Sequence, residues 1–252
     1  MASPIFTGVG VALVTLFDAD GAVDAAATAA HALRLVEEGV SAVVLAGTTG
    51  EAAGLDPEER SLLVAETARA IDGRVPLIAG TGAPSARQAT ALSRRAEADG
   101  ADALLVLSPP GASDPRPYYE QVAAAVEIPV LAYHFPKVSA PGVPVEALRE
   151  LPVDGIKDSS GDAERLALEA DQLATGIYVG RPSLLLLAGA LGCSGAILAL
   201  ANVEVAGCVE ALAGDPDAQR RVVAEGAGLP SIAALKRALA ERHGTRPDTR
   251  LG

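Results

Sequence analysis

The sequence predicts a (β/α)₈ barrel, or TIM barrel, that forms a single α/β domain. Its 252 residues suit this fold, which commonly occupies about 250 residues in one domain. Short apolar runs without periodicity are typical of strands buried on both faces, and they alternate with longer segments of helical spacing. There are eight segments of each kind, which is the number found in this barrel.

The expected strands are short apolar runs with no two-residue alternation, as in the buried sheet of a barrel. They lie at Val9–Phe17, Ala42–Gly47, Pro76–Gly80, Ala103–Leu107, Pro129–His134, Gly155–Lys157, Ile177–Gly180 and Gly195–Leu200.

The expected helices are the Ala-, Leu-, Arg- and Glu-rich segments between these runs. Asp56 precedes a proline and two glutamates, which is a typical helix start, and Ser85 and Asp162 are further N-cap residues. The helices are predicted at Asp24–Glu38, Pro57–Ile71, Ala86–Asp99, Pro117–Val126, Val145–Leu151, Ala163–Leu173, Ser183–Leu191 and Val203–Leu212.

A doubly wound sheet would show the same alternation with fewer units. Eight pairs followed by a further helical segment, Asp215–Arg242, favour the barrel. The residues after the first strand, Phe17–Gly21, lack the Gly-x-Gly-x-x-Gly pattern of dinucleotide-binding folds. We expect a barrel core at 1–202 and, at 203–252, the last barrel helix with a short C-terminal helical tail.

The net charge of −12 argues against nucleic acid as a partner, because phosphate binding needs clusters of basic residues. The N-terminus has no basic region followed by an apolar core, so no signal peptide is expected. Pro182–Val203 is uncharged and long enough to span a bilayer, but glycines such as Gly189 and Gly192 interrupt it. We interpret it as a helix, a turn and a strand, and expect a cytoplasmic protein without a membrane partner.

Neither cysteines nor histidines form a metal-binding pattern. Cys193 and Cys208 lie in apolar surroundings without metal-ligand spacing, which favours reduced, buried thiols. His31, His134 and His243 are far apart in the sequence. We therefore expect no metal and no cofactor.

Lys157 is the most informative residue. Only three of the twenty basic residues are lysines, and Lys137 and Lys236 are interpreted as solvated surface residues. Lys157 instead lies where an apolar strand gives way to a polar turn. Burial disfavours the charged ammonium, and a neutral amine can attack a ketone to form a Schiff base. The alternative is a lysine whose head group reaches solvent at the edge of the sheet.

Other polar residues also follow the strands, and the active sites of such barrels form at the C-terminal strand ends. Gly47-Thr48-Thr49-Gly50 is either an ordinary tight turn or a small anion site made of N–H groups and hydroxyls. Tyr133 is either a core aromatic or a general acid/base beside the lysine. His134 points away from Tyr133 on a strand, and we interpret it as structural. Glu51 is expected to anchor a loop.

The chain resembles the dihydrodipicolinate synthase / N-acetylneuraminate lyase family of pyruvate-dependent class I aldolases. The resemblance runs from about Phe6 to Asn202. It rests on Gly47-Thr48-Thr49-Gly50-Glu51, Tyr133-His134-Phe135-Pro136 and Gly155-Ile156-Lys157-Asp158-Ser159-Ser160-Gly161, in this order. Residues 195–202 and the segment Arg246–Leu251 add to it.

This resemblance implies that Lys157 forms a Schiff base with the keto carbon of pyruvate or another 2-keto acid. It implies that Tyr133 shuttles protons to and from the adduct and that Thr48 relays them. Thr49, with neighbouring N–H groups such as that of Gly47, would hold the carboxylate, and Gly180 and the backbone of Ile197 would line the same pocket.

Two positions depart from the synthase branch. The tyrosine expected after the fourth strand is absent from Ser108-Pro109-Pro110-Gly111, and Val138 stands where an arginine is expected. Ser108, Tyr118, Tyr119 or water are candidates to replace the tyrosine. These departures place the chain nearer to the lyases and keto-acid aldolases.

We therefore predict a Schiff-base aldolase or lyase that joins or separates pyruvate and an aldehyde, working as a homo-oligomer, a dimer or tetramer. The substrate would be 4-hydroxy-2-oxoglutarate or a 2-keto-3-deoxy sugar acid. A dehydratase acting on 2-keto-3-deoxy acids and a non-catalytic keto-acid-binding protein remain open alternatives. Arg181, after the seventh strand, is either a surface residue or the contact for a second anionic group of the substrate.

Overall fold

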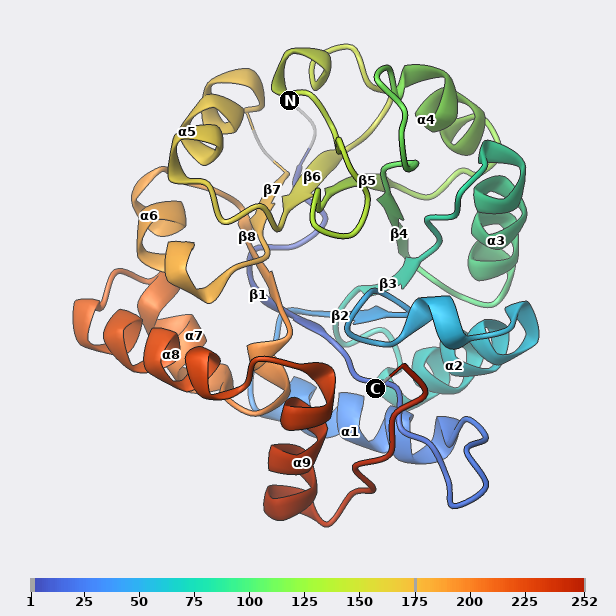
Figure 1. The fold of residues 1–252 in the computed structure, drawn as a ribbon, viewed down its shortest axis with the longest axis vertical. Coiled ribbons are helices and arrows are strands. Elements are labelled where there is room, and N and C mark those ends of the chain that lie inside the picture. Colours follow the sequence, from blue (N-terminus) through green and yellow to red (C-terminus); the bar gives the residue numbers. More distant parts are fainter. Residues whose placement is uncertain (1–2, 175, 252) are drawn as a thin grey trace.

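The structure, a computed structural model describing residues 3–174 and 176–251, is a closed barrel of eight parallel strands surrounded by helices (Figure 1). Each strand pairs with its sequence neighbours, and β8 closes the barrel against β1. The predicted fold class is confirmed. The strands are β1 Gly8–Ala12, β2 Ala42–Leu45, β3 Leu77–Gly80, β4 Ala103–Leu107, β5 Val130–His134, β6 Gly155–Asp158, β7 Ile177–Val179 and β8 Gly195–Leu198.

The helices begin where the sequence offers capping residues. Ser85 accepts a hydrogen bond from the Gln88 N–H, Asp162 accepts two from the first turn of its helix, and Asp56 forms a capping box with Glu59. The helices are α1 Ala25–Glu37, α2 Pro57–Ile71, α3 Ala86–Ala98, α4 Arg116–Ala123, α5 Ala163–Gln172, α6 Leu185–Ala190, α7 Val205–Leu212, α8 Pro216–Gly228 and α9 Ile232–His243.

Several predicted elements end earlier in the structure, and two differ by four residues or more. The expected helix at Val145–Leu151 is only a 3₁₀ turn at Val145–Ala147. It lies in a short segment between Pro144 and Pro152, too short to offset the cost of starting a helix. The first strand ends at Ala12 rather than Phe17, because the N–H groups of Val14 and Leu16 bond to the side chains of Asn202 and Thr28 instead of to a neighbouring strand.

The uncharged stretch 182–203 is divided as expected. A 3₁₀ turn at Pro182–Leu184 leads into α6, and the chain then forms β8. No helix in the described ranges is both long enough and apolar enough to cross a bilayer.

Side chains alternate between two apolar layers. The outer layer fills the space between strands and helices. The inner layer fills the barrel, where Phe6 stacks on Tyr178 with ring centroids 4.4 Å apart. The inner layer comprises Phe6, Ala12, Ala42, Val44, Ile78, Ala103, Leu105, Leu131, Tyr133, Tyr178 and Ile197. The barrel is therefore packed below its mouth, and ligands must bind at the C-terminal strand ends.

Gly155 opens β6 at a point where another backbone passes very close. A Cβ atom at Gly155 would lie 2.1 Å from the Gly176 carbonyl oxygen, which accepts the Ile156 N–H. Any side chain at position 155 would therefore collide with the backbone of Gly176. Moving that backbone away would break the hydrogen bond between the Ile156 N–H and the Gly176 carbonyl, in the strand that carries Lys157.

We predict that Gly155→Ala lowers the free energy of unfolding by about 2–4 kcal/mol, through overpacking against backbone. Denaturant unfolding monitored by circular dichroism measures the change. Gly228→Ala is the matched control, since nothing lies within 4 Å of its Cβ, and it should change stability by less than about 1 kcal/mol. Equal effects of the two substitutions would contradict this account.

Candidate active site

Tyr133 and Lys157 face each other across two neighbouring strands. They are register partners in the parallel pair β5–β6. The Lys157 Nζ lies 4.4 Å from the centroid of the Tyr133 ring. Both side chains are buried, with 4% and 5% of their surface exposed. Tyr133 belongs to the inner layer, so the amine lies on the inner side of the barrel, at the C-terminal end of β6.

The amine has no counter-ion among the described residues, because no carboxylate lies within ion-pair distance of its Nζ. Its recorded contact is the face of the Tyr133 ring. Burying an unpaired ammonium is costly. A primary amine held in this way beside a phenol is suited to attack a carbonyl and exchange protons with it.

The residues that follow these two point to the other side of the sheet. His134 pairs in register with Asp158. The His134 Nδ1 accepts a hydrogen bond from the Val143 N–H at 2.9 Å. Burial, with a smaller contribution from the charge of Arg165, lowers the pKa of His134 to about 4. A neutral ring bound to backbone agrees with the structural role predicted for this histidine.

The layer behind Lys157 contains a compact group of charges. Asp158 accepts hydrogen bonds from the N–H and hydroxyl of Ser160. Arg165 lies between Asp158, at 3.8 Å, and Glu169, at 2.8 Å. Burial nevertheless raises the pKa of Glu169 to about 8. Because these carboxylates face the helices, they do not pair with the Lys157 amine on the inner side of the barrel.

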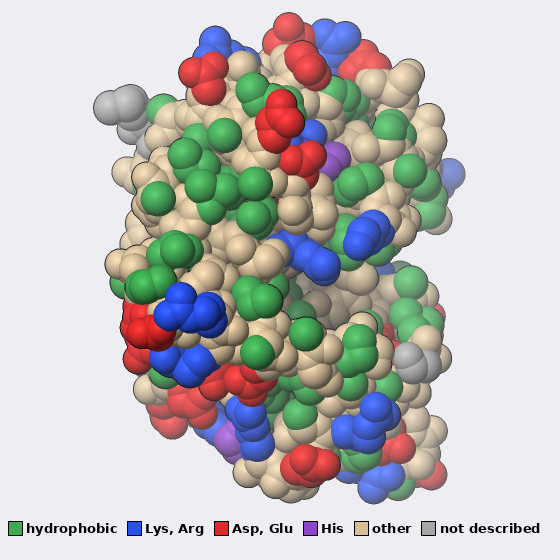
Figure 2. Space-filling model, turned by 60° about the vertical axis from the view of Figure 1, so that its left-hand side comes forward, with side chains coloured by type: hydrophobic (Ala, Val, Ile, Leu, Met, Phe, Trp, Pro, Cys, Tyr) green, Lys and Arg blue, Asp and Glu red, His purple; other side chains and the backbone are tan. Residues whose placement is uncertain are grey.

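Two cavities open at the barrel mouth, where the surface is hollowed and carries basic side chains on its upper edge (Figure 2). One, of about 480 Å³, is lined by Gly47, Thr48 and Tyr133 among others. The second, of about 610 Å³, is lined by Thr49, Gly180 and Arg181 among others. We call them the tyrosine-side and arginine-side cavities.

The candidate residues therefore surround one mouth but are divided between two cavities. Strand β6 lies between β5, which carries Tyr133, and β7, which leads to Gly180. Lys157 lies at this boundary and is not among the lining residues of either cavity. Ile197 is 1% exposed in the inner layer and likewise lines neither.

Positive charge near the mouth is scarce. Arg116 is held by Asp114 and Glu150, and Arg60 bonds to backbone carbonyls. Arg181 has no recorded ion-pair or hydrogen-bond partner in the described part of the chain, and its side chain runs past Gly161 into the arginine-side cavity. It is thus available to an anionic ligand.

Of the three side chains considered as replacements for the missing tyrosine, only one lies at the mouth. The Tyr118 hydroxyl bonds to the backbone of Ala83, and the buried Tyr119 hydroxyl donates to the Val106 carbonyl. Ser108 lines the tyrosine-side cavity, and its buried hydroxyl has no hydrogen-bond partner in the structure as described.

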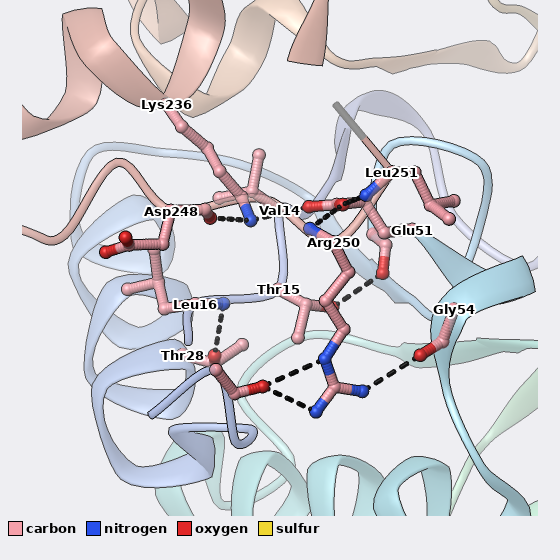
Figure 3. A network of polar contacts seen from close by, with 12 residues as sticks. Val14, Thr15, Leu16, Thr28, Glu51, Gly54, Lys236, Asp248, Arg250 and Leu251 are labelled. Carbon is pink, nitrogen blue, oxygen red and sulfur yellow. Dashed lines mark hydrogen bonds and ion pairs between the residues drawn. The ribbon is translucent and has the colours of Figure 1, made fainter. Parts of the chain in front are cut away.

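Glu51 ends the Gly-Thr-Thr-Gly turn, and its carboxylate is buried in a network shown in Figure 3. It accepts hydrogen bonds from Lys236 Nζ at 2.6 Å and from the N–H groups of Arg250 and Leu251. The prediction that Glu51 anchors a loop is consistent with these bonds. The prediction that Lys236 is a solvated surface residue is wrong, because it is fully buried against Glu51 and over the Phe17 ring.

Sequence reasoning also missed Leu251, which lines the tyrosine-side cavity although it lies 200 residues after Glu51. The indication in the sequence was the segment Arg246–Leu251, which adds to the family resemblance but could not be placed at the mouth without the fold. No group of three metal-ligating side chains gathers within the described ranges.

Comparison with known proteins agrees with this architecture. Residues 5–214 match the sequence model of the dihydrodipicolinate synthetase family. A DapA-like lyase of Halobacterium salinarum is 38% identical, with 91% of this chain and 79% of the relative covered. A 4-hydroxy-tetrahydrodipicolinate synthase of Pseudomonas aeruginosa is 35% identical, covering 86% and 80%. The E. coli K12 prophage protein YagE, solved in complex with pyruvate, superposes with a TM-score of 0.91 at 26% identity, covering 97% and 91%.

We predict that His134 makes the protein less stable in acid. Its ring is protonated near pH 6.5 when unfolded but only near pH 4 when folded, so the unfolded state binds a proton first as the pH falls. The free energy of unfolding should drop between pH 6.5 and 4, by roughly 1–3 kcal/mol from this residue.

Denaturant unfolding at pH 7 and pH 4.5 measures this drop. In His134→Asn the amide oxygen still accepts the Val143 N–H but does not titrate, so the variant should lose less stability on acidification than the wild type. His31, whose pKa burial also lowers to about 4, titrates in both proteins and cancels in the comparison. An identical pH dependence would exclude His134 as a source.

Proposed function

The chain belongs to the dihydrodipicolinate synthetase family, and we propose that it is a class I lyase that forms or cleaves a carbon–carbon bond between pyruvate and an aldehyde. The observation that carries the proposal is the placement of the Lys157 amine against the Tyr133 ring at the barrel mouth. A similar structure was solved with pyruvate, which supports a 2-keto acid as ligand.

In the proposed reaction, the Lys157 amine attacks the keto carbon and forms a carbinolamine, which loses water to give an imine. The protonated imine accepts the electron pair released when the bond to the aldehyde carbon breaks, leaving an enamine. Protonation of the enamine and hydrolysis return pyruvate and the free amine. Each step moves a proton, and in the proposed mechanism the Tyr133 phenol on the adjacent strand carries it, with Thr48 as relay.

The carboxylate of the keto acid would bind at the Gly-Thr-Thr-Gly turn. Thr49 offers a hydroxyl, and the backbone of Gly47 and its neighbours offers N–H groups at the end of β2. Gly180 and the backbone of Ile197 would complete the pocket on the far side of Lys157. Ser108, whose buried hydroxyl has no partner among the described residues, is our candidate to stand in for the missing tyrosine.

The proposed substrate is 4-hydroxy-2-oxoglutarate or a 2-keto-3-deoxy sugar acid, acted on by a homo-oligomer. Condensation to 4-hydroxy-tetrahydrodipicolinate is the second candidate, since relatives such as that of Pseudomonas aeruginosa carry this name. The absence of a tyrosine in Ser108–Gly111 and the presence of Val138, exposed at the cavity rim, favour the lyase. Product analysis separates both from a dehydratase, which would release a dehydrated keto acid and no pyruvate.

We predict that pyruvate and borohydride together add one reduced pyruvate to the protein, because borohydride reduces the imine to a stable amine. Intact mass spectrometry detects the adduct. Lys157→Ala should lose it and all turnover, whereas Lys137→Ala, which removes an exposed lysine of the same mouth, should keep both. An adduct on Lys157→Ala would exclude this lysine, and an adduct without turnover on any keto acid would favour the non-catalytic alternative.

We predict that Arg181→Ala discriminates between substrates. If Arg181 binds a second anionic group of the substrate, Arg181→Ala should lower kcat/KM for a dianionic keto acid by about 10–100-fold. This is the effect expected for the loss of one charge-assisted hydrogen bond. The same variant should leave a monoanionic keto acid nearly unaffected. Arg87→Ala, an exposed arginine on α3 without a recorded partner, is the control. An equal loss on both substrates would remove the specificity role.

A further inference from the structure

A buried network joins residues 248–251 to the turn that contains Thr48 and Thr49. The Glu51 carboxylate has 1% exposure and follows that turn directly. One carboxylate oxygen accepts from Lys236 on α9, and the other accepts from the Arg250 and Leu251 N–H groups at 2.7 and 2.8 Å (Figure 3). Lys236 also donates to the Asp248 carbonyl. Within the described ranges, every hydrogen-bond partner of this buried carboxylate therefore comes from the last seventeen residues of the sequence.

The Arg250 side chain fastens the same segment from the opposite side. Its guanidinium donates to the carbonyls of Gly21 and Gly54 and to both carboxylate oxygens of Glu59, at 2.7–2.9 Å. It also lies over the Phe17 ring. Gly54 belongs to the chain that leaves the Gly-Thr-Thr-Gly turn. The guanidinium thus ties that chain to the start of α2.

The turn itself requires outside support. Glu51 adopts a left-handed conformation, with φ 56°, which is unfavourable for a residue with a side chain. Local hydrogen bonds from the Glu51 N–H to the Thr48 carbonyl and from the Ala52 N–H to the Gly47 carbonyl close the turn. A buried carboxylate that lost its partners would leave this conformation, because an unpaired charge is strongly disfavoured there.

The same segment also borders the ligand space. Leu251 packs against Gly54 and lines the tyrosine-side cavity together with Thr48 and Tyr133. Residues 248–251 therefore touch the candidate site twice, as a wall of the cavity and as the support of the turn.

We propose that Glu51 and Arg250 are positioning residues for keto-acid binding: by fastening residues 248–251 to the turn 47–54, they hold Thr48 and Thr49 where a carboxylate binds. This inference rests on the proposed function. Neither side chain touches the reacting atoms. Loosening the network should weaken substrate binding while leaving the chemistry at Lys157 and Tyr133 unchanged.

The test compares Arg250→Ala with Arg242→Ala. Arg242 is a matched control, because it also fastens the C-terminal region, through Val203 and Glu225, but away from the mouth. Two quantities are measured. The first is the pyruvate concentration that gives half-maximal borohydride trapping. The second is the amide hydrogen exchange of residues 47–54.

In Arg250→Ala, the half-saturating pyruvate concentration should rise about tenfold, as expected for the loss of one or two charge-assisted hydrogen bonds. The adduct yield at saturation should stay at the wild-type level. Exchange of residues 47–54 should also be about tenfold faster. Arg242→Ala should lower the unfolding midpoint but leave both quantities unchanged. Glu59→Gln, a milder change that removes the partner charge of Arg250, should shift both in the same direction if Arg250→Ala does not fold.

Unchanged exchange of residues 47–54 in the folded Arg250 and Glu59 variants would overturn the proposed coupling. Faster exchange with unchanged half-saturation would overturn the role in binding and leave a purely structural one. Wild-type protein that forms no adduct at all would instead overturn the proposed function, and the exchange comparison would still decide whether the segment holds the turn.

Discussion

The parallel register between β5 and β6 is the constraint on which the candidate site depends. It sets Tyr133 beside Lys157 on the inner side of the barrel and His134 beside Asp158 on the outer side. Because side chains alternate along a strand, a shift of β6 by one residue would turn Lys157 to the outer side and place Ile156 or Asp158 beside Tyr133. On its other side β6 pairs with β7, and there Gly155 passes the backbone of Gly176 with no room for a side chain. Strand β6 is therefore fixed between β5 and β7, with Lys157 facing the inside of the barrel.

The candidate site combines residues on the strands of the barrel with residues on a turn that the C-terminal segment holds in place. Tyr133 and Lys157 lie on strands of a closed sheet, whereas Thr48 and Thr49 lie on a turn whose conformation depends on distant residues. Within the described ranges, the Glu51 carboxylate has no hydrogen-bond partner in that turn, and it relies on Lys236 and on backbone N–H groups nearly 200 residues away. A buried ion pair of this kind is weak evidence for stability, since its desolvation offsets much of the attraction. Its geometry, however, specifies where the turn and the C-terminal segment lie.

Charge is distributed unevenly around the mouth. The tyrosine-side cavity has mostly apolar walls, and the guanidinium of Arg60 there is occupied by backbone carbonyls. The arginine-side cavity holds Arg181, which has no partner in the described ranges. Lys157 lies between the two cavities and is not among the lining residues of either. The two cavities therefore differ in charge: one offers a ligand mostly apolar walls, and the other offers the Arg181 guanidinium.

Hydrophobic pattern and capping residues were enough to predict all eight strands and the barrel, because both signals are local in the chain. The motifs around Thr48, Tyr133 and Lys157 were likewise visible, since each lies just after an apolar run.

Two predictions from the sequence were wrong, for different reasons. The short segment at Val145–Leu151 has helical composition, but two flanking prolines reduce it to one turn. Lys236 has the composition of a surface residue, and only the approach of Glu51 from another part of the chain makes its burial possible. Local sequence determined the elements and the chemistry they carry. Tertiary structure alone decided which charges are buried together, because the energy of a buried charge depends on partners that the fold, not the chain order, brings near.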